Sequence, residues 1–170
     1  MTDKELKELL VLLKLYPYED YIDDIKIDSS VKNNKYEFYE EVNIHVFLKI
    51  PNECPVCHSH NVKRVRTKVK SNIIHSFSTM IQKEKFGTKG RINLTYYAMV
   101  CKQCGETFTN SDVLTTITNK ITDYTVVGVL RSLSDLGKTY KNVADIFRIS
   151  ATLVQKLFDE PSRSRLCTTS

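Results

Sequence analysis

The pattern of hydrophobic and polar positions predicts β structure in the first two thirds of the chain and helices at its end. Residues 3–15 place leucines at the i, i+3, i+4, i+7 spacing of a short amphipathic helix. Tyr16-Pro17 ends this helix, because proline disfavours the α conformation in the residue before it. Residues 18–35 are acidic and polar and predict a loop or an irregular cover. The leucines of the helix face are Leu6, Leu9, Leu10 and Leu13.

Several later runs alternate with a period of two and predict strands. The first extends from Tyr36 to Ile50, and another is Arg91–Val100. Val62–Val69 predicts a basic strand, and Thr107–Thr109 a short one. Residues 71–88 are apolar without a clear period, and either cover the β structure or form a short helix. Alternation puts Val62, Arg64, Arg66 and Lys68 on one side of the basic strand, and Lys63, Val65, Thr67 and Val69 on the other.

From Ile121 the period becomes helical, and Gly137 marks the end of a helix. The next stretch, 139–160, follows the apolar template of a helix-turn-helix. An ordinary helical hairpin would show the same apolar spacing, and Arg148 stands where this turn often has glycine. The positions that match the template are Val143, Ala144, Phe147, Ile149, Val154 and Leu157.

The start of the second helix of this pair carries the candidate base-reading residues. Ser150 is expected to cap the helix through its hydroxyl. The residues after it that point outward lie where a recognition helix meets base edges in the major groove. The candidate DNA contacts of this helix are Ser150, Ala151, Thr152, Gln155 and Lys156.

Two Cys-x-x-Cys pairs supply the chemistry most specific to this sequence: Cys54 with Cys57, and Cys101 with Cys104. Four thiolates form a closed tetrahedral site for one structural Zn²⁺, which leaves no position for a reactive water. The pairs are separated by 43 residues, more than is usual in a zinc ribbon, so a β insertion is expected between them. Gly105 follows the second pair and supports a positive φ there.

Other interpretations of the cysteines fit the pattern less well. A redox dithiol needs one reactive pair at the start of a helix, and disulfides need an oxidising compartment. Another thiolate-bound metal or cluster remains an alternative to zinc. His58, which takes the place equivalent to Gly105, and His60 are competing ligands.

Charge is distributed unevenly along the chain. Residues 54–109 hold 10 lysines and arginines against 2 acidic residues, whereas residues 1–53 hold 7 against 12. This asymmetry favours a polyanionic partner for the middle section. No signal segment or run of about 20 apolar residues is visible, which predicts a soluble cytoplasmic protein without a membrane partner. The candidate phosphate contacts are Lys63, Arg64, Arg66, Lys68 and Arg91.

The predicted fold class is α+β, with a zinc-ribbon β domain followed by a helix-turn-helix domain. The segments are an N-terminal helix and acidic cover over 1–35, the ribbon over 36–110, the helical domain over 111–161, and a tail over 162–170.

The cysteine pairs, the basic strands and the helix-turn-helix together resemble the N-terminal half of ISL-type bacterial insertion-sequence transposases, over residues 36–160. This resemblance implies binding of double-stranded DNA at terminal inverted repeats, a bacterial nucleoid location and four cysteine zinc ligands. The chain stops at Ser170 without room for that family's catalytic domain, so it is expected to bind DNA without cutting it.

The main expectation is therefore a non-enzymatic, zinc-dependent, sequence-specific DNA-binding protein, with a homodimer as one candidate assembly and without a small-molecule substrate. The alternative is a protein-interaction adaptor or antagonist built on a zinc ribbon. An enzyme is disfavoured, because no Ser/His/Asp set, phosphate-cradling loop or open metal position is visible.

Overall fold

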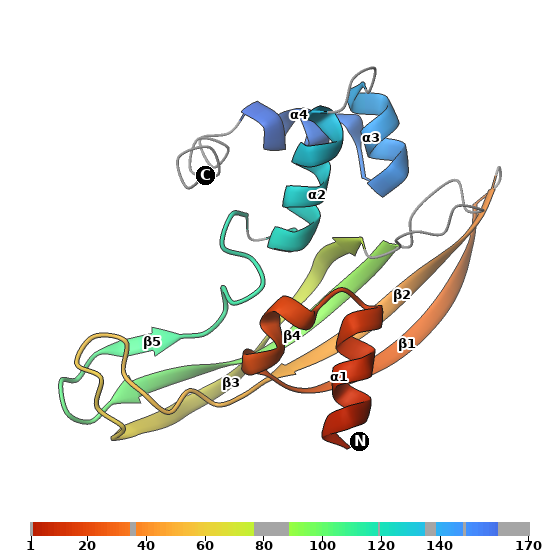
Figure 1. Ribbon diagram of the computed structural model, residues 1–170. Coiled ribbons are helices and arrows are strands. Elements are labelled where there is room, and N and C mark those ends of the chain that lie inside the picture. Colours follow the sequence, from red (N-terminus) through yellow and green to blue (C-terminus); the bar gives the residue numbers. More distant parts are fainter. Residues whose placement is uncertain are drawn as a thin grey trace.

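The computed structural model describes residues 2–34, 37–76, 89–118, 120–134, 139–147 and 149–159. It is a mixed α+β structure, as the sequence predicts, with an elongated sheet, an N-terminal helix near its middle and the C-terminal helices grouped on another side (Figure 1). The elements are α1 (Asp3–Leu12), the 3-10 helix η1 (Tyr16–Tyr21), β1 (Ile22–Asn34), β2 (Glu37–Leu48), β3 (Val62–Ser76), β4 (Lys89–Cys101), β5 (Thr107–Thr109), α2 (Asp123–Ser134), α3 (Tyr140–Phe147) and α4 (Ala151–Asp159).

The sheet has the strand order β1-β2-β4-β3, and β5 pairs with the far end of β4. β1 and β2 are antiparallel, β2 and β4 are parallel, and β3 runs antiparallel to β4. β4 is therefore the central strand. Along one of its edges it pairs first with β2 and then with β5, and along the other with β3.

β1 corrects the expectation of a loop over residues 18–35. Ile22 and Ile25 are buried. Asp24 and Asp28 lie on the other face of the sheet, where they pair with Phe47 and Asn43 of β2. A register shift between Ile22 and Asp24 interrupts the alternation, which conceals the strand in the sequence. Pairing with the strongly alternating β2 outweighs the low β propensity of the aspartates.

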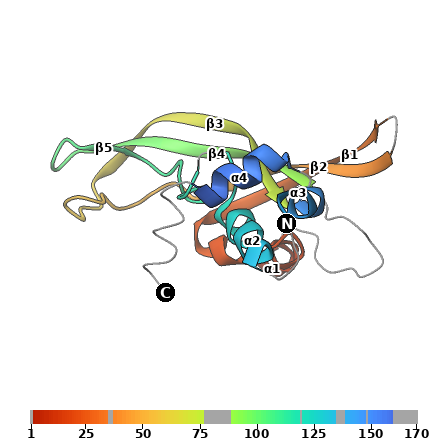
Figure 2. The ribbon, with the colours of Figure 1, turned by 90° about the horizontal axis from the view of Figure 1, so that it is seen from above.

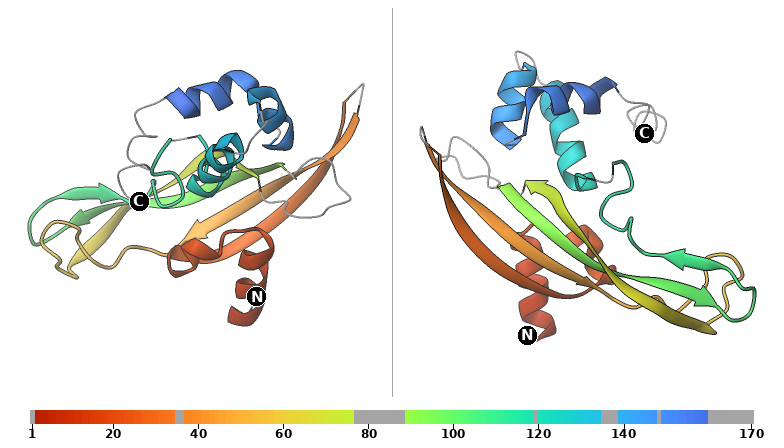
Figure 3. Two further views of the ribbon diagram at one scale, coloured as in Figure 1. Left: turned by 45° about the horizontal axis from the view of Figure 1, so that its top comes forward. Right: turned by 180° about the vertical axis from the view of Figure 1, so that it is seen from behind.

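α1 covers one face of the sheet, which we call the core face. Leu10, Leu13 and Leu15 pack there against Ile44 and Ile92 in one hydrophobic cluster. A capping box between Thr2 and Glu5 begins the helix. The other face of the sheet, which points away from α1, we call the open face. It is the face toward the viewer when the molecule is seen from behind, with α1 beyond the strands (Figure 3, right).

The three C-terminal helices form a second hydrophobic cluster. Its buried residues include Val129 of α2, Val143 of α3, and Val154 and Leu157 of α4. Gly128 allows α2 to approach α3 closely, because a Cβ there would lie 3.1 Å from the Phe147 ring. The predicted helix end at Gly137 and the turn residue Arg148 lie outside the described residues.

β3 connects the sheet to these helices. It runs on to Ser76, and Ile73 is buried in the sheet cluster. The backbone of Ile74 bonds to Lys120 at 2.8 Å and to Thr122 at 3.0 Å. Figure 2 shows the resulting arrangement, with α3 and α4 over the middle of the sheet, between β5 at one end and the β1–β2 end at the other. The rest of the stretch predicted as cover or helix, from residue 77 to 88, lies outside the described residues.

A buried hydrogen-bonded chain passes through this junction. The Leu13 carbonyl can only accept, so His75 Nε2–H donates to it at 2.7 Å, and Nδ1 accepts from the Thr122 hydroxyl at 2.7 Å. Thr125 donates in turn to Thr122 at 2.9 Å and accepts from the Ser76 N–H at 3.0 Å. The chain thus joins the segment after α1, the end of β3 and the start of α2.

Candidate functional site

The arm is the part of the molecule that carries the cysteines. We define it as β3 from Val62 to Lys70, β4 from Tyr96 to Cys101, β5 and the two cysteine turns. It extends from the body at the end opposite the helices (Figure 1). Val65 and Val69 of β3 are 59% and 60% exposed, so this half of β3 is not part of a hydrophobic core.

The first cysteine turn is closed by backbone hydrogen bonds. The Cys54 N–H donates to the Ser59 carbonyl at 2.9 Å, and the His58 N–H donates to the Cys54 carbonyl at 2.9 Å. His58 has a φ of 61°, in the left-handed region that favours glycine. The Val56 N–H points at the Cys54 sulfur at 3.4 Å.

The second turn repeats these backbone bonds at the equivalent positions. The Cys101 N–H donates to the Glu106 carbonyl at 2.8 Å, and the Gly105 N–H donates to the Cys101 carbonyl at 2.9 Å. Gly105 has a φ of 77°, as its place after the cysteine pair predicts. His58 and Gly105 are therefore equivalent, and the two turns are related by local pseudosymmetry.

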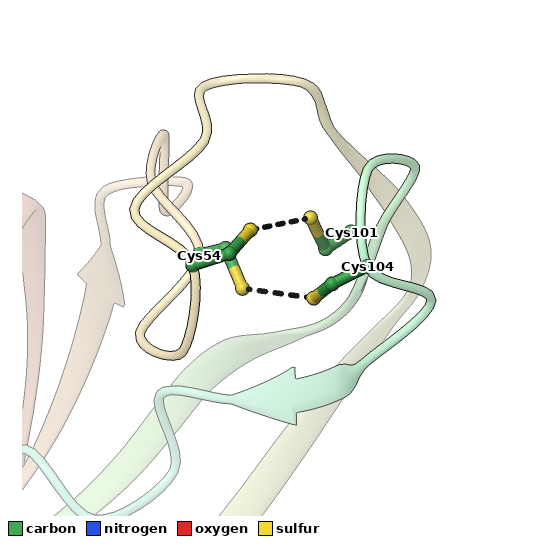
Figure 4. A group of neighbouring side chains, drawn as sticks. Cys54, Cys101 and Cys104 are labelled. Carbon is green, nitrogen blue, oxygen red and sulfur yellow. Dashed lines mark hydrogen bonds between the residues drawn. The ribbon is translucent and has the colours of Figure 1, made fainter.

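The four sulfurs converge between the turns. The Sγ atoms of Cys54, Cys57, Cys101 and Cys104 all lie within 4.8 Å of one another. Cys54 lies 3.7 Å from Cys104, and Cys57 lies 3.5 Å from Cys101, both measured between sulfurs. Figure 4 shows Cys54 facing Cys101 and Cys104 across the gap. These four residues can hold one metal ion.

The two candidate histidine ligands have other partners. His58 Nδ1 lies 3.1 Å from a carboxylate oxygen of Glu53, and His60 Nδ1 lies 2.9 Å from the carbonyl of Asn52. Among the described residues, the metal-binding group consists of the four cysteines.

The backbone of each turn favours a thiolate on its first cysteine. The N–H of Cys104 is the main cause that lowers the pKa of Cys101 to about 7, and the N–H of Cys57 is the main cause that lowers the pKa of Cys54. The Glu106 N–H acts in the same direction on Cys104, but burial and the neighbouring sulfurs outweigh it and raise that pKa to about 12. A bound cation would hold all four as thiolates.

The basic residues of β3 are divided between the two faces of the arm, which differs from simple alternation. Arg64 pairs with Met99, and Arg66 pairs with Ala98. The chain therefore advances by two residues in β3 where it advances by one residue in β4. This β-bulge reverses the phase of the strand. Arg66 therefore lies on the same face as Lys63, which pairs with Val100, and opposite to Arg64.

The remaining predicted phosphate contacts lie on different surfaces. Lys68 pairs with Tyr96 and shares the face of Arg66. Arg91 lies in the body of the sheet, half-buried, where it pairs with Asn43 and Ile74 on the open face. The structure thus brings Lys63, Arg66 and Lys68 together, and separates Arg64 and Arg91 from them.

The start of α4 has the exposure that its sequence predicts. The Ser150 hydroxyl accepts from the Leu153 N–H at 3.1 Å and so caps the helix. Val154 and Leu157 are buried against the other helices. Four residues on the other side of α4 are exposed: Ala151, Thr152, Gln155 and Lys156.

Asn110 supports the base of the arm, a role that no sequence pattern indicates. Its Oδ1 accepts from the Tyr97 N–H at 2.8 Å, and its Nδ2 donates to the Lys49 carbonyl at 3.3 Å. The side chain thus fills the position on the edge of β4 where β2 has ended and β5 has not begun.

Replacing Asn110 with alanine is expected to destabilise the chain by about 1–2 kcal/mol, because the Tyr97 N–H loses its acceptor. Urea unfolding followed by circular dichroism measures the change. Asn52→Ala is the matched control, because Asn52 accepts from His60 through its backbone carbonyl and not through its side chain. Equal stabilities of the two variants would contradict the role of Asn110.

Comparisons with protein-family models, with curated proteins and with solved structures give no match. None of the helices in the described ranges has the length and apolar character needed to span a bilayer.

Proposed function

We propose that the chain is a zinc-dependent protein that binds double-stranded DNA in a sequence-specific way. The observation that carries this proposal is the start of α4. The helix is capped by Ser150, is anchored by Val154 and Leu157, and exposes Thr152, Gln155 and Lys156. In a helix-turn-helix, such a helix enters the major groove with its N-terminal residues toward the bases.

Each of the three exposed side chains has a chemical preference in the groove. The amide of Gln155 can donate to and accept from the edge of an adenine. Thr152 can contact a thymine methyl group, and Lys156 can contact guanine or a phosphate. Together they form a short reading surface that is compatible with a few base pairs.

The proposed metal is one structural Zn²⁺ ion. Tetrahedral Zn–S bonds of about 2.3 Å require sulfurs about 3.8 Å apart, and the two short separations in the site are 3.7 and 3.5 Å. Four protein thiolates fill a tetrahedral coordination shell, so this ion would organise the arm and would not activate water. Binding without catalysis is the function that this chemistry supports.

The resemblance of the cysteine pattern and the helical pair to ISL-type transposases suggests the class of target. In that case the recognised DNA is the terminal inverted repeat of a mobile element. A homodimer on such DNA would require two half-sites separated by about one helical turn, roughly 10 base pairs.

Selection of duplexes from a random-sequence library tests the proposal without assuming any target site. We expect a preferred sequence to be enriched, and the zinc-loaded chain to bind it at least about 1000-fold more tightly than a random duplex. Gln155→Ala should weaken binding to the selected duplex by about tenfold or more, and leave binding to the random duplex unchanged.

Gln103→Ala is the matched control, since Gln103 is an exposed glutamine in the second cysteine turn. It should leave the base preference unchanged. Equal affinity of the wild-type chain for selected and random duplexes would remove the sequence-specific claim. An adaptor that binds protein through its ribbon would enrich no duplex and would be insensitive to Gln155→Ala.

A further inference from the structure

The β-bulge in β3 gives the arm one strongly basic face. Lys63, Arg66 and Lys68 face the same way as Tyr96, Ala98 and Val100 of β4, because each pairs with one of these residues. All three cationic side chains are exposed. We call these three residues the basic face.

Carboxylates do not neutralise the basic face. The cross-strand positions of β5 on this side are Thr107 and Thr109, which pair with Val100 and Ala98. Within the described residues, no acidic side chain forms an ion pair with Lys63, Arg66 or Lys68. Three unpaired cations on a neutral β surface attract a polyanion.

The opposite face of the arm has a different character. Arg64 is its cation from β3, and its guanidinium carbon lies 5.9 Å from the centre of the Tyr97 ring. Next to this pair are the half-buried Phe108 and the buried Met99, which face each other across β4 and β5. This face is mainly aromatic and apolar, and its cation already has a partner.

The body of the molecule limits the inner end of the basic face. Lys70 lies on the same side as Lys68, but its Nζ donates to the Thr115 hydroxyl at 3.0 Å. Burial lowers the pKa of Lys70, and Tyr96 packs on the core cluster. The part free to contact a ligand therefore extends from Lys63 to Lys68.

We infer that the arm lies along the DNA backbone on its basic face alone, with Lys63, Arg66 and Lys68 at phosphates and Arg64 turned away. The inference rests on the proposed function. It adds which surface of the arm touches DNA. The three phosphate contacts from β3 are then Lys63, Arg66 and Lys68, whereas simple alternation along the sequence would assign Arg64 in place of Lys63.

Two arginines two positions apart provide a matched test. Arg64→Gln and Arg66→Gln each remove one positive charge from the same strand, and only Arg66 belongs to the basic face. The probes are the selected duplex and a random duplex, titrated by fluorescence anisotropy between about 50 and 300 mM salt. The slope of log affinity against log salt counts phosphate contacts.

Arg66→Gln is expected to reduce the magnitude of this slope by about 0.9 and to weaken binding about eightfold at roughly 0.1 M salt on both duplexes. Arg64→Gln should change neither quantity. The triple variant Lys63→Gln, Arg66→Gln, Lys68→Gln should reduce the slope by about 2.7. Zinc content and circular dichroism establish that each variant is folded, and Lys68→Gln replaces Arg66→Gln if that variant does not fold.

Equal effects of Arg64→Gln and Arg66→Gln, or a larger effect of Arg64→Gln, would overturn the inference and leave sequence-specific binding through α4 intact. A chain that binds neither duplex would overturn both proposals. A chain that loses base preference through Gln155→Ala but keeps its full salt slope in the triple variant would overturn the inference about the arm alone.

Discussion

Removal of the proposed zinc ion is expected to unfold the arm and to leave the body folded. Neither hydrophobic cluster contains a cysteine, so we expect the two turns and the outer half of β3 to depend on the metal. In zinc-finger peptides at neutral pH, structural Zn²⁺ contributes about 10–16 kcal/mol of apparent binding free energy. Hydrogen exchange with and without chelator should show loss of protection from Val62 to Lys70, with protection retained at Ile44 and Ile92.

Cys101→Ser should reproduce the effect of chelation, because it removes one of the four sulfurs. Cys167→Ser makes the same chemical change at the cysteine that belongs to neither Cys-x-x-Cys pair and is the control. Metal analysis is expected to give one zinc per wild-type chain and per Cys167→Ser chain. Protection of the arm that persists in the metal-free protein would show that packing alone stabilises it.

Acid should destabilise the body through His75. The side chain is completely buried, and burial lowers its pKa from 6.5 to about 4, against a smaller opposing effect of the Leu13 carbonyl. Between these two values the unfolded chain binds a proton that the folded chain does not. Stability is therefore complete above pH 6.5 and falls as the pH decreases toward 4, by about 3 kcal/mol in total.

Urea unfolding of the chain at pH values between about 7.5 and 4 measures this decline. His75→Gln should remove most of the dependence on pH in this range, at a cost in stability at neutral pH, because the buried partners at Leu13 and Thr122 are no longer matched by an imidazole. His60→Gln is the control, since His60 is exposed and its Nδ1 bonds to the backbone carbonyl of Asn52 and not to a carboxylate. A decline that is the same in wild type and His75→Gln would assign it to other groups.

Features that a single element displays along its own sequence could be predicted. The leucines of α1, the alternation of β2 and the apolar template of α3 and α4 each repeat at the period of one element. The cysteine turns belong to the same class, because two cysteines at fixed spacing define a local conformation, and in the second turn the following glycine supports the positive φ. These patterns were sufficient to place the four sulfurs together and to expose the start of α4.

Features that depend on the phase of a partner strand could not be predicted. The bulge at Arg64 and Arg66 has no signature in a run of alternating basic and β-branched residues, yet it moves Arg64 to the opposite face. The shift between Ile22 and Asp24 similarly conceals β1 behind its aspartates. Pairing decides both, and pairing is a property of two strands.

Hydrogen bonds between residues far apart in the sequence are the second kind of feature that the sequence could not predict. His75 bonds to a carbonyl 62 residues away, and Asn110 to one 61 residues away. Neither residue lies in a motif: His75 falls in the stretch 71–88, which has no clear period, and Asn110 follows the short predicted strand Thr107–Thr109. The fold gives both their roles by bringing those distant carbonyls within reach.

The central position of β4 limits when the sheet can form during synthesis of the chain. β2 and β3 do not pair with each other; both pair with β4, which follows them in the chain. When residues 1–76 have emerged from the ribosome, β1 and β2 can pair with each other, but β3 has no neighbouring strand. Cotranslational folding of the sheet must wait for the strand that separates them, and the nascent β3 needs protection from misassembly until that strand emerges.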